Sequence, residues 1–310
     1  MKILVVGAGA VGGYFGARLA QAGRDVTFLV RPARAQQLQK DGLHILSPHG
    51  DLTLKPQTVT SDDISHHYNV IFVSVKAQAL DQAIKDMKPA VGPDTMIYPV
   101  LNGMRHMETL SRIFGEQKVL GGVCMVSTEL DEQNRIVQMT PMQKLIYGER
   151  SGELTPRIRA LDEALHDASF DTELSTTIIQ AMWQKWVMIA SLGLVTCLLG
   201  GPIGEINAVP DGKQTALQAL DECAAIAKAC GFPTPPPLLE NLHKQATDKD
   251  SKFTSSMYRD LQKGAPVEVD AILGDLVEQG HAHHIETPLL QAGCVRLRVY
   301  QNTLQSAKHS

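Results

Sequence analysis

The stretch that decides the fold is MKILVVGAGAVGGYFGARLAQAGRDVTFLVR, residues 1–31. A short β-branched apolar run, residues 2–6, leads directly into a glycine-rich turn, residues 7–12. Apolar residues then recur at helical spacing until Gly23, and a second apolar run covers residues 26–30. This order of strand, glycine turn, helix and strand predicts the start of a parallel α/β domain.

The glycine turn matches the G-x-G-x-x-G pattern of dinucleotide-binding folds. Gly7 would make the tight turn, Gly9 would let the backbone approach a pyrophosphate, and Gly12 would let the helix pack closely on the strand. Free N–H groups at the start of the helix would favour a phosphate group. We expect a dinucleotide site, and the alternative is a glycine turn in an ordinary strand–helix–strand unit. The residues expected to form this part of the cofactor site are Gly7, Ala8, Gly9, Ala10, Val11 and Gly12.

The residue after the second strand indicates which dinucleotide would bind. NAD sites usually place Asp or Glu about 20 residues past the glycines, where it binds the ribose 2′-hydroxyl. Here the strand ends at Val30 and is followed by Arg31 rather than by an acid. Because arginine presents a planar, permanently charged fork that suits a 2′-phosphate, we predict NADPH as the cofactor. The alternative is an arginine in a solvated loop.

Two later strands also end in polar residues. An apolar strand over residues 69–75 is followed by Lys76, and a strand over residues 95–101 is followed by Asn102. Ligands of open α/β sheets bind at the carboxyl ends of strands, so we expect Lys76 to supply a second cation near the cofactor. The amide of Asn102 could serve a nicotinamide ribose or a substrate oxygen. The alternatives are a lysine that starts a helix and an Asn-Gly turn without a function.

The spacing of apolar residues changes near residue 174, from alternating strand and helix patterns to almost only helical periodicity. We predict a doubly wound, Rossmann-type α/β domain over residues 1–174 and an all-helical domain over residues 175–310. In the first domain a polar turn over residues 131–134 precedes two predicted strands, residues 136–139 and 144–147. In the second domain Gly280 is predicted to end a helix.

Composition restricts the class of protein. A length of 310 residues suits two domains, and a net charge of −4 gives no reason to expect nucleic acid or an anionic membrane as partner. The 5 cysteines are dispersed without a C-x-x-C pair, which fits buried thiols in a reducing compartment. Because the chain opens directly in a core strand, we expect no signal peptide and a cytoplasmic location.

Two local features have an ordinary structural interpretation. The apolar stretch over residues 186–201 is shorter than the ~18–20 residues of a membrane span, so a buried core helix is expected. The histidines at positions 281, 283 and 284 follow a predicted helix end without an evident cysteine or carboxylate partner. We interpret them as a solvated turn and expect no metal site.

The motifs taken together resemble the ketopantoate reductase (2-dehydropantoate 2-reductase) family of NADPH enzymes in pantothenate synthesis. The resemblance spans nearly the whole chain, and both domains contribute. The matching positions are the glycine turn, Arg31, Lys76, Asn102, Trp183, Lys185, Ser255, Ser256, Asp260, Glu268 and Asp270. The resemblance implies a Rossmann-type domain followed by a helical domain.

Lys185 is the residue that we expect to act as the general acid, as the resemblance implies. Hydride transfer to a ketone leaves an alkoxide that must be protonated. Lys185 lies among apolar residues on a helix that must be largely buried, and burial makes a lysine a better proton donor near neutral pH. The alternative is a lysine at a helix edge that extends to solvent.

The resemblance assigns roles to four other residues. Asn102 matches a residue shared between nicotinamide and substrate, and Ser256 would hydrogen-bond the substrate. Glu268 would reach the cofactor ribose or the catalytic lysine across the cleft, and its alternative is a solvated acid on a helix. Ser127 would line the cofactor. Substrate binding is thus expected of Asn102, Lys185 and Ser256.

Three positions depart from the family pattern. Ile189, Gly193 and Ile203 stand where the family usually has asparagines that bind the substrate. A site that hydrogen-bonds polar groups discriminates strongly, whereas an apolar site does not. An enlarged apolar pocket could therefore accept a bulkier or less polar substrate.

The leading interpretation is an NADPH-dependent reductase of a small-molecule 2-oxo acid, with ketopantoate to pantoate as the named reaction. One alternative is a reductase of the same fold for a different ketone, imine or 2-oxo acid. The other is a non-catalytic NADPH-binding protein, against which the joint presence of Lys185, Ser256 and Glu268 argues. The helical domain offers apolar surface that could pair in a homodimer, although no motif argues for it.

Overall fold

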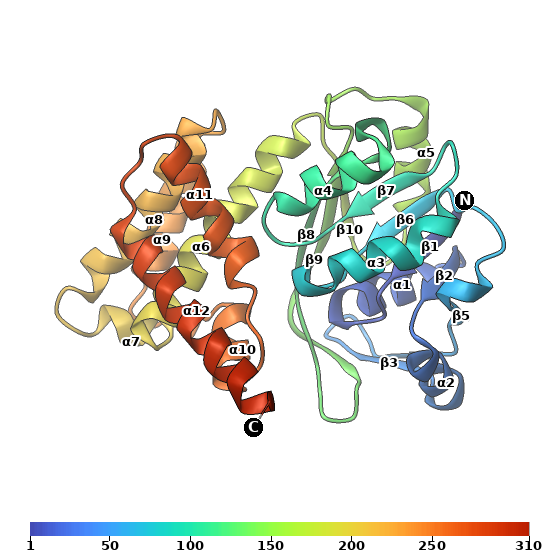
Figure 1. Cartoon of the computed structure of the whole chain (residues 1–310), viewed down its shortest axis with the longest axis horizontal. Coiled ribbons are helices and arrows are strands. Elements are labelled where there is room, and N and C mark those ends of the chain that lie inside the picture. Colours follow the sequence, from blue (N-terminus) through green and yellow to red (C-terminus); the bar gives the residue numbers. More distant parts are fainter. Residues whose placement is uncertain (310) are drawn as a thin grey trace. The chain divides into compact units, whose positions relative to one another are not determined.

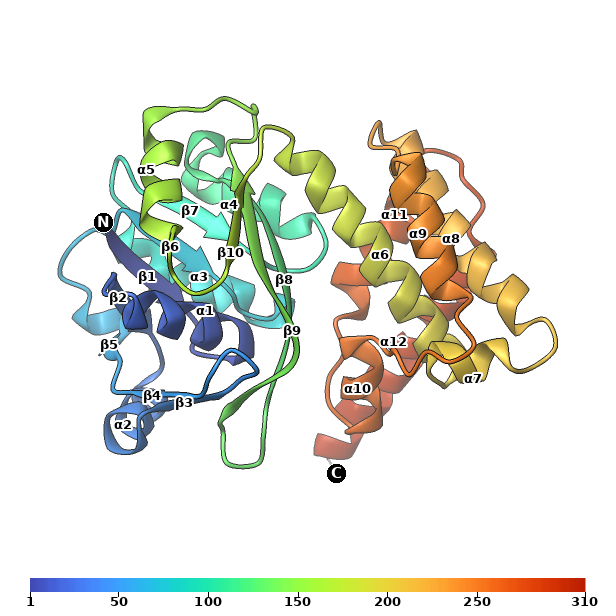
Figure 2. The same cartoon turned by 180° about the vertical axis from the view of Figure 1, so that it is seen from behind.

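The computed structural model describes residues 1–309 and divides into two compact units (Figures 1 and 2). The first unit comprises Met1–Leu101 and His106–Ile179. The second comprises Asn102–Arg105 and the chain from Gln180 onward. The division near Ile179 falls shortly after the boundary expected at residue 174, and the short segment 102–105 is assigned to the helical unit.

The first unit contains a parallel five-stranded sheet in the order β5-β2-β1-β6-β7. The β-branched run at the chain start forms the central strand, whose neighbours on both sides are buried apolar strands. This parallel sheet confirms the predicted fold class for the first half of the chain. Its strands are β1 (Lys2–Val6), β2 (Asp25–Leu29), β5 (Gln57–Val59), β6 (Val70–Val73) and β7 (Met96–Pro99).

Helices cover this sheet, and close packing fixes the first of them. A Cβ atom on Gly16 would lie 2.6 Å from the ring of Phe28, so only a glycine lets this helix approach β2 so closely. The aromatic rings of Phe15, Phe28 and Phe72 are fully or almost fully buried in the core. The helices of this unit are α1 (Ala10–Gln21), α2 (Pro32–Asp41), α3 (Leu80–Met87), α4 (Arg105–Phe114) and α5 (Pro156–Leu165).

A second, mixed sheet in the same unit was not predicted. It has the order β10-β9-β3-β4, with β8 paired to β9 as a long hairpin that Figure 2 shows in green. Its strands are β3 (Leu43–Leu46), β4 (Leu52–Leu54), β8 (Gly121–Leu130), β9 (Ile136–Gly148) and β10 (Asp171–Leu174).

The prediction of separate strands over residues 136–139 and 144–147 was wrong, because both belong to the continuous strand β9. Of the intervening residues 140–143, Gln143 pairs with Val126 of β8. The hydroxyl of Tyr14 lies 2.8 Å from the side-chain oxygen of Gln138 and also contacts that of Gln143, and it can donate its one proton to either of them. One tyrosine therefore contacts both ends of the segment between the two predicted strands.

The second unit is helical, as predicted, and is built on α6. This helix is long and apolar enough to resemble a membrane span, but most of its most apolar stretch is buried inside the structure, as in a core helix. The helices of this unit are α6 (Ile178–Leu199), α7 (Ile203–Asn207), α8 (Gly212–Ala229), α9 (Pro236–Ala246), α10 (Ser256–Gln262), α11 (Asp275–Ala282) and α12 (Pro288–His309). A π-helical turn, Asp270–Gly274, leads directly into α11.

Gly280 does not end its helix, contrary to the prediction, because α11 continues to Ala282. A Cβ atom at this position would lie 3.3 Å from the side chain of Ile226 and 3.5 Å from that of Thr287. The glycine therefore permits close packing of α11 against α8 and needs no left-handed backbone.

Candidate active site

Three of the candidate cofactor residues follow neighbouring strands of the parallel sheet. Gly7 follows β1, Arg31 follows β2, and Lys76 follows β6. Because β2 and β6 flank β1 and all three strands are parallel, their carboxyl ends meet at one edge of the sheet. Arg31 and Lys76 are both exposed. The edge therefore carries two cations beside the glycine turn.

The glycine turn has the geometry that each predicted role requires. Gly7 adopts a φ of 96°, which an L side chain rarely tolerates. No atom lies within 4 Å of a Cβ placed on Gly9, so the backbone at the start of α1 is open to a ligand. A Cβ on Gly12 would lie 2.2 Å from the carbonyl oxygen of Gly7 and 2.0 Å from the hydroxyl of Ser74. These residues therefore fit a pyrophosphate-containing cofactor.

Arg34 is a further residue at this edge to which we assigned no role from the sequence. Its guanidinium donates a hydrogen bond of 3.2 Å to the carbonyl of Ala8 in the glycine turn and another of 2.8 Å to Gln37. Burial lowers the pKa of Arg34 somewhat. The sequence could have indicated a role for Arg34, because it follows Arg31 by three positions and residues three apart share a helix face.

Ser127 lies in β8 at an irregularity of the strand. The pairing register between β8 and β9 shifts between Val126 and Thr128, where Ser127 stands opposite the longer β9 segment 139–142. Ser127 is half-buried. The cofactor-lining role expected for Ser127 stays a prediction.

In the helical unit, α6 presents the candidate general acid. Lys185 is half-buried, while Trp186 and Val187 beside it are almost fully buried. Ile189 and Gly193 follow at intervals of four residues, so they continue the face of α6 that carries Lys185.

The space beside Gly193 is filled rather than open. A Cβ at this position would lie 2.8 Å from the methyl carbon of Met257, which is only 2% exposed. Ile203 is also buried, at 3% exposure. Apolar atoms of Met257 therefore occupy the volume that a side chain longer than glycine would need at this position.

The start of α10 places Ser256 near the same helix. Ser255 caps α10 by accepting a hydrogen bond of 2.9 Å from the backbone N–H of Tyr258. The hydroxyl of Ser255 also lies 2.9 Å from that of Thr196 on α6. Ser256, the first residue of α10, is exposed and free of the capping task.

Asn102 and Glu268 are brought together within the helical unit. The side-chain amide of Asn102 donates a hydrogen bond of 3.4 Å to a carboxylate oxygen of Glu268. Both side chains are half-buried. Two candidate site residues that are remote in the sequence are therefore neighbours in space.

Within residues 1–309, no group of three or more His, Cys, Asp or Glu side chains could hold a metal ion.

Comparisons with known proteins agree with this architecture. The family model described as ketopantoate reductase PanE/ApbA matches residues 3–152, and its C-terminal counterpart matches residues 177–301. The chain therefore belongs to the ketopantoate reductase family and is an oxidoreductase.

Curated relatives match over almost their full length. The uncharacterized oxidoreductase YkpB of Bacillus subtilis (strain 168) is 36% identical over 301 residues, which cover 97% of this chain and 99% of the relative. A 2-dehydropantoate 2-reductase of Mesorhizobium japonicum is 26% identical over 313 residues, covering 94% of this chain and 95% of the relative.

Solved structures share the fold. The 2-dehydropantoate 2-reductase of Geobacter metallireducens superimposes with a TM-score of 0.86 at 25% identity, covering 96% of this chain and 99% of its own. A D-mandelate dehydrogenase in complex with NADH and anilino(oxo)acetate superimposes with a TM-score of 0.87 at 19% identity, covering 98% and 99%. At that identity the second likeness shows the fold alone.

Proposed function

We propose that this protein reduces a 2-oxo acid with NADPH, and that the leading substrate is 2-dehydropantoate (ketopantoate), which would yield pantoate for pantothenate synthesis. The observation that carries this function is the contact between Asn102 and Glu268 in the unit whose core helix carries Lys185. The family to which the chain belongs, and the relatives named 2-dehydropantoate 2-reductase, support it.

NADPH rather than NADH is proposed because of the charge at the sheet edge. Arg31 follows the second strand where NAD sites have an acid, and Lys76 and Arg34 add positive charge at the same edge of the sheet. A 2′-phosphate would neutralise this charge, whereas a 2′-hydroxyl would not. The glycine turn and the start of α1 would hold the pyrophosphate.

The proposed reaction gives one role to each candidate site residue of the helical unit. The cofactor supplies a hydride to the carbonyl carbon of the substrate when bound. Lys185 then donates its proton to the alkoxide oxygen, and solvent returns a proton to the amine. Asn102 and Ser256 would orient the oxygens of the substrate, and Glu268 would hold the amide of Asn102 in one orientation.

A second candidate is a reductase of the same kind for a less polar ketone or 2-oxo acid. It is favoured by Ile189, by the burial of Ile203 and by the methyl group of Met257 beside Gly193. None of these groups can hydrogen-bond a substrate hydroxyl. A site without such partners rejects apolar analogues poorly.

A substrate panel tests the proposal. We expect NADPH oxidation at 340 nm with 2-dehydropantoate, and a lower kcat/KM when NADH replaces NADPH. The same assay with 2-oxo acids that carry branched aliphatic or aromatic side chains separates the two candidates. The highest kcat/KM with one of these acids would favour the second candidate. Equal use of NADH and NADPH would contradict the role of Arg31, and no turnover with any acid would overturn the proposed function.

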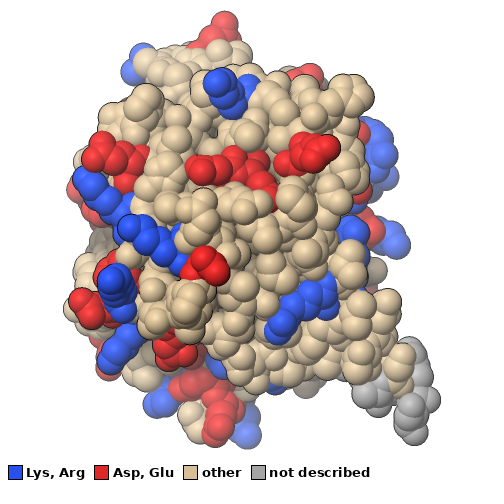
Figure 3. All heavy atoms as spheres, turned by 90° about the vertical axis from the view of Figure 1, so that its left-hand side faces the viewer, with Lys and Arg blue, Asp and Glu red and all other residues tan. Residues whose placement is uncertain are grey.

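Two further expectations concern the state of the protein in the cell. The dispersed cysteines, which form no C-x-x-C pair in the sequence, support a reducing, cytoplasmic compartment. Residues other than Lys, Arg, Asp and Glu cover most of the face of the helical unit that Figure 3 presents. Val295 and Val299 on α12 are 61% and 60% exposed, one helical turn apart. Apolar surface of this kind supports a homodimer, which sedimentation would test.

A further inference from the structure

The segment that carries Asn102, residues 102–105, belongs to a different unit from the elements that it connects. It connects β7 to α4, both of which belong mainly to the α/β unit. Residues 102–105 nevertheless group with the helical unit, whereas Leu101 and His106 on either side do not. Residues of this segment contact four residues of the helical unit, Glu268, Ala271, Asp275 and Glu278.

Two of these contacts involve Asn102 and Gly103. Asn102 bonds to Glu268, as described above. Gly103 has a φ of 76°, and a Cβ there would lie 2.0 Å from the carbonyl oxygen of Ala271. The backbone of the segment therefore approaches the π-helical turn so closely that only a glycine fits at position 103.

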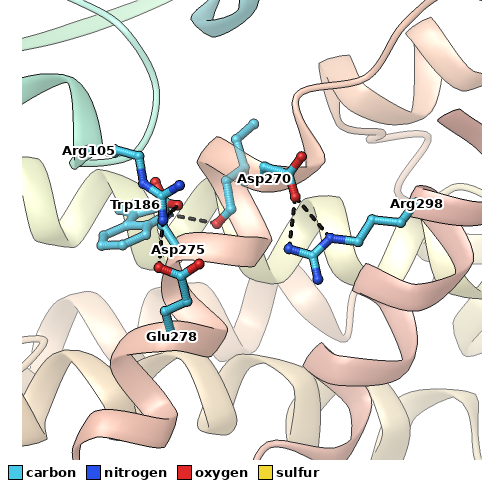
Figure 4. A network of polar contacts seen from close by, with 7 residues as sticks. Arg105, Trp186, Asp270, Asp275, Glu278 and Arg298 are labelled. Atoms are coloured by element: carbon cyan, nitrogen blue, oxygen red, sulfur yellow. Dashed lines mark hydrogen bonds and ion pairs between the residues drawn. The ribbon is translucent and has the colours of Figure 1, made fainter. Parts of the chain in front are cut away.

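Arg105 supplies the strongest contact at the far end of the segment. One nitrogen of its guanidinium lies 2.7 Å from a carboxylate oxygen of Asp275 and 2.5 Å from one of Glu278 (Figure 4). The side chain of Asp275 is only 8% exposed, whereas those of Arg105 and Glu278 are 53% and 63% exposed. The contact with Glu278 is also a hydrogen bond, whereas neither carboxylate oxygen of the buried Asp275 has a hydrogen-bond partner among the described residues, so Arg105 supplies a counter-charge to Asp275.

A second ion pair holds the neighbouring turn. Arg298 on α12 contacts Asp270 through two nitrogens, at 2.9 and 2.8 Å. Figure 4 shows that this pair points away from Arg105. Arg298 therefore fixes the start of the π-helical turn through Asp270, whereas the ion pair of Asp275 is made with Arg105.

We propose that Arg105 is a positioning residue. Its ion pairs with Asp275 and Glu278 hold the segment 102–105 on the helical unit, so that Asn102 and Glu268 present their side chains to substrate and cofactor as one preformed pair. This role rests on the function proposed above. It assigns no chemistry to Arg105, which would act only through Asn102.

The test is a double-mutant cycle with a matched control. Arg105→Met removes the charge and keeps an unbranched side chain, and Arg112→Met makes the same change at an exposed position of the same helix. We expect Arg105→Met to lower kcat/KM by about 10-fold or more, since small misplacements of binding groups are costly. Arg112→Met should leave it within about 2-fold. Arg105→Lys should recover part of the loss, because lysine restores the positive charge but not the planar guanidinium group.

The cycle distinguishes positioning from a general structural effect. In an Asn102→Ala background, Arg105→Met should have little further effect on kcat/KM or on the dissociation constant for NADPH. Losses that multiply would overturn the proposal, and so would equal activity of Arg105→Met and Arg112→Met. If the wild type turned over no 2-oxo acid, the proposed function would fail. The cycle measured on NADPH affinity alone would then still decide the role of Arg105, while thermal unfolding would identify a variant that fails to fold.

Discussion

At the scale of single residues, Asp275 is a carboxyl group that the fold buries at a cost in free energy. It is 6% exposed, and this burial is the largest influence on its ionisation. Burial raises the pKa of Asp275 to about 6, although Arg105 and Arg298 act in the opposite direction and Glu278 and Asp270 act with it. The folded protein therefore holds this proton more tightly than the unfolded chain.

We expect Asp275→Asn to change how stability depends on pH. The carboxyl titrates near 3.8 when unfolded and near 6 when folded, so its contribution is fully present below pH 3.8 and is lost as the pH rises through 6. Between pH 5 and pH 8 the free energy of unfolding of the wild type should fall by about 1–2 kcal/mol more than that of the variant. Urea unfolding at the two pH values measures this difference, and equal slopes for both proteins would contradict the assignment.

Lys185→Ala should affect chemistry far more than binding. Loss of a positioned general acid costs about 10²–10⁴ in rate. We expect kcat to fall within that range while the dissociation constant for NADPH, measured by fluorescence titration, stays nearly constant. Unchanged kcat would remove Lys185 from the mechanism.

Site residues differed in how far local sequence could predict their surroundings. Gly7, Arg31 and Lys76 each follow an apolar run directly, so the rules for parallel sheets predicted the edge that they share. The contact between Asn102 and Glu268 joins distant parts of the chain, and no periodicity indicates it. It depends on tertiary packing.

At the scale of elements, the π-helical turn before α11, Asp270–Gly274, departs from regular α-helical geometry. Its carbonyl at Ile272 accepts a hydrogen bond of 2.8 Å from the indole nitrogen of Trp186, which is 2% exposed. Trp186 directly follows Lys185 in α6. Its hydrogen bond therefore connects the π-helical turn to the part of α6 that carries the candidate general acid. Wide turns of this type are frequent at functional sites.

Trp186→Phe should weaken both stability and catalysis. It leaves the buried carbonyl of Ile272 without its indole donor, which costs about 1–3 kcal/mol. Trp183→Phe is the matched control, because Trp183 stacks on Phe232 and makes no indole hydrogen bond within the described part of the chain. We expect kcat to fall more in Trp186→Phe than in Trp183→Phe, and equal kcat values would refute a link between this bond and Lys185.

Element boundaries could be predicted where they depend on local chemistry and not where they depend on packing. Gly200 follows α6 and has a φ of 80°, as a glycine at a helix end does. Strand β9 is continuous over residues that we predicted as two separate strands, and Tyr14 contacts Gln138 within it. Gly280 looks like a helix end but serves packing against Ile226.

At the scale of the whole molecule, the order of an α/β unit followed by a helical unit could be predicted from the change in periodicity near residue 174. The second sheet could not, because β3, β9 and β10 pair across long stretches of sequence. The assignment of the segment 102–105 to the helical unit could not be predicted from the sequence either, because it depends on tertiary contacts such as that between Gly103 and Ala271.

The most direct test of the central claim follows the hydride itself. The purified protein is incubated with 2-dehydropantoate and NADPH deuterated at C4 of the dihydronicotinamide, with each face labelled in turn, and the product is analysed by mass spectrometry. We expect one of the two labelled cofactors to give a 2-hydroxy acid that carries a single deuterium at C2. Oxidation of neither cofactor, and no deuterated 2-hydroxy acid from 2-dehydropantoate or from any other 2-oxo acid of the panel, would contradict the assignment of this protein as a 2-oxo acid reductase.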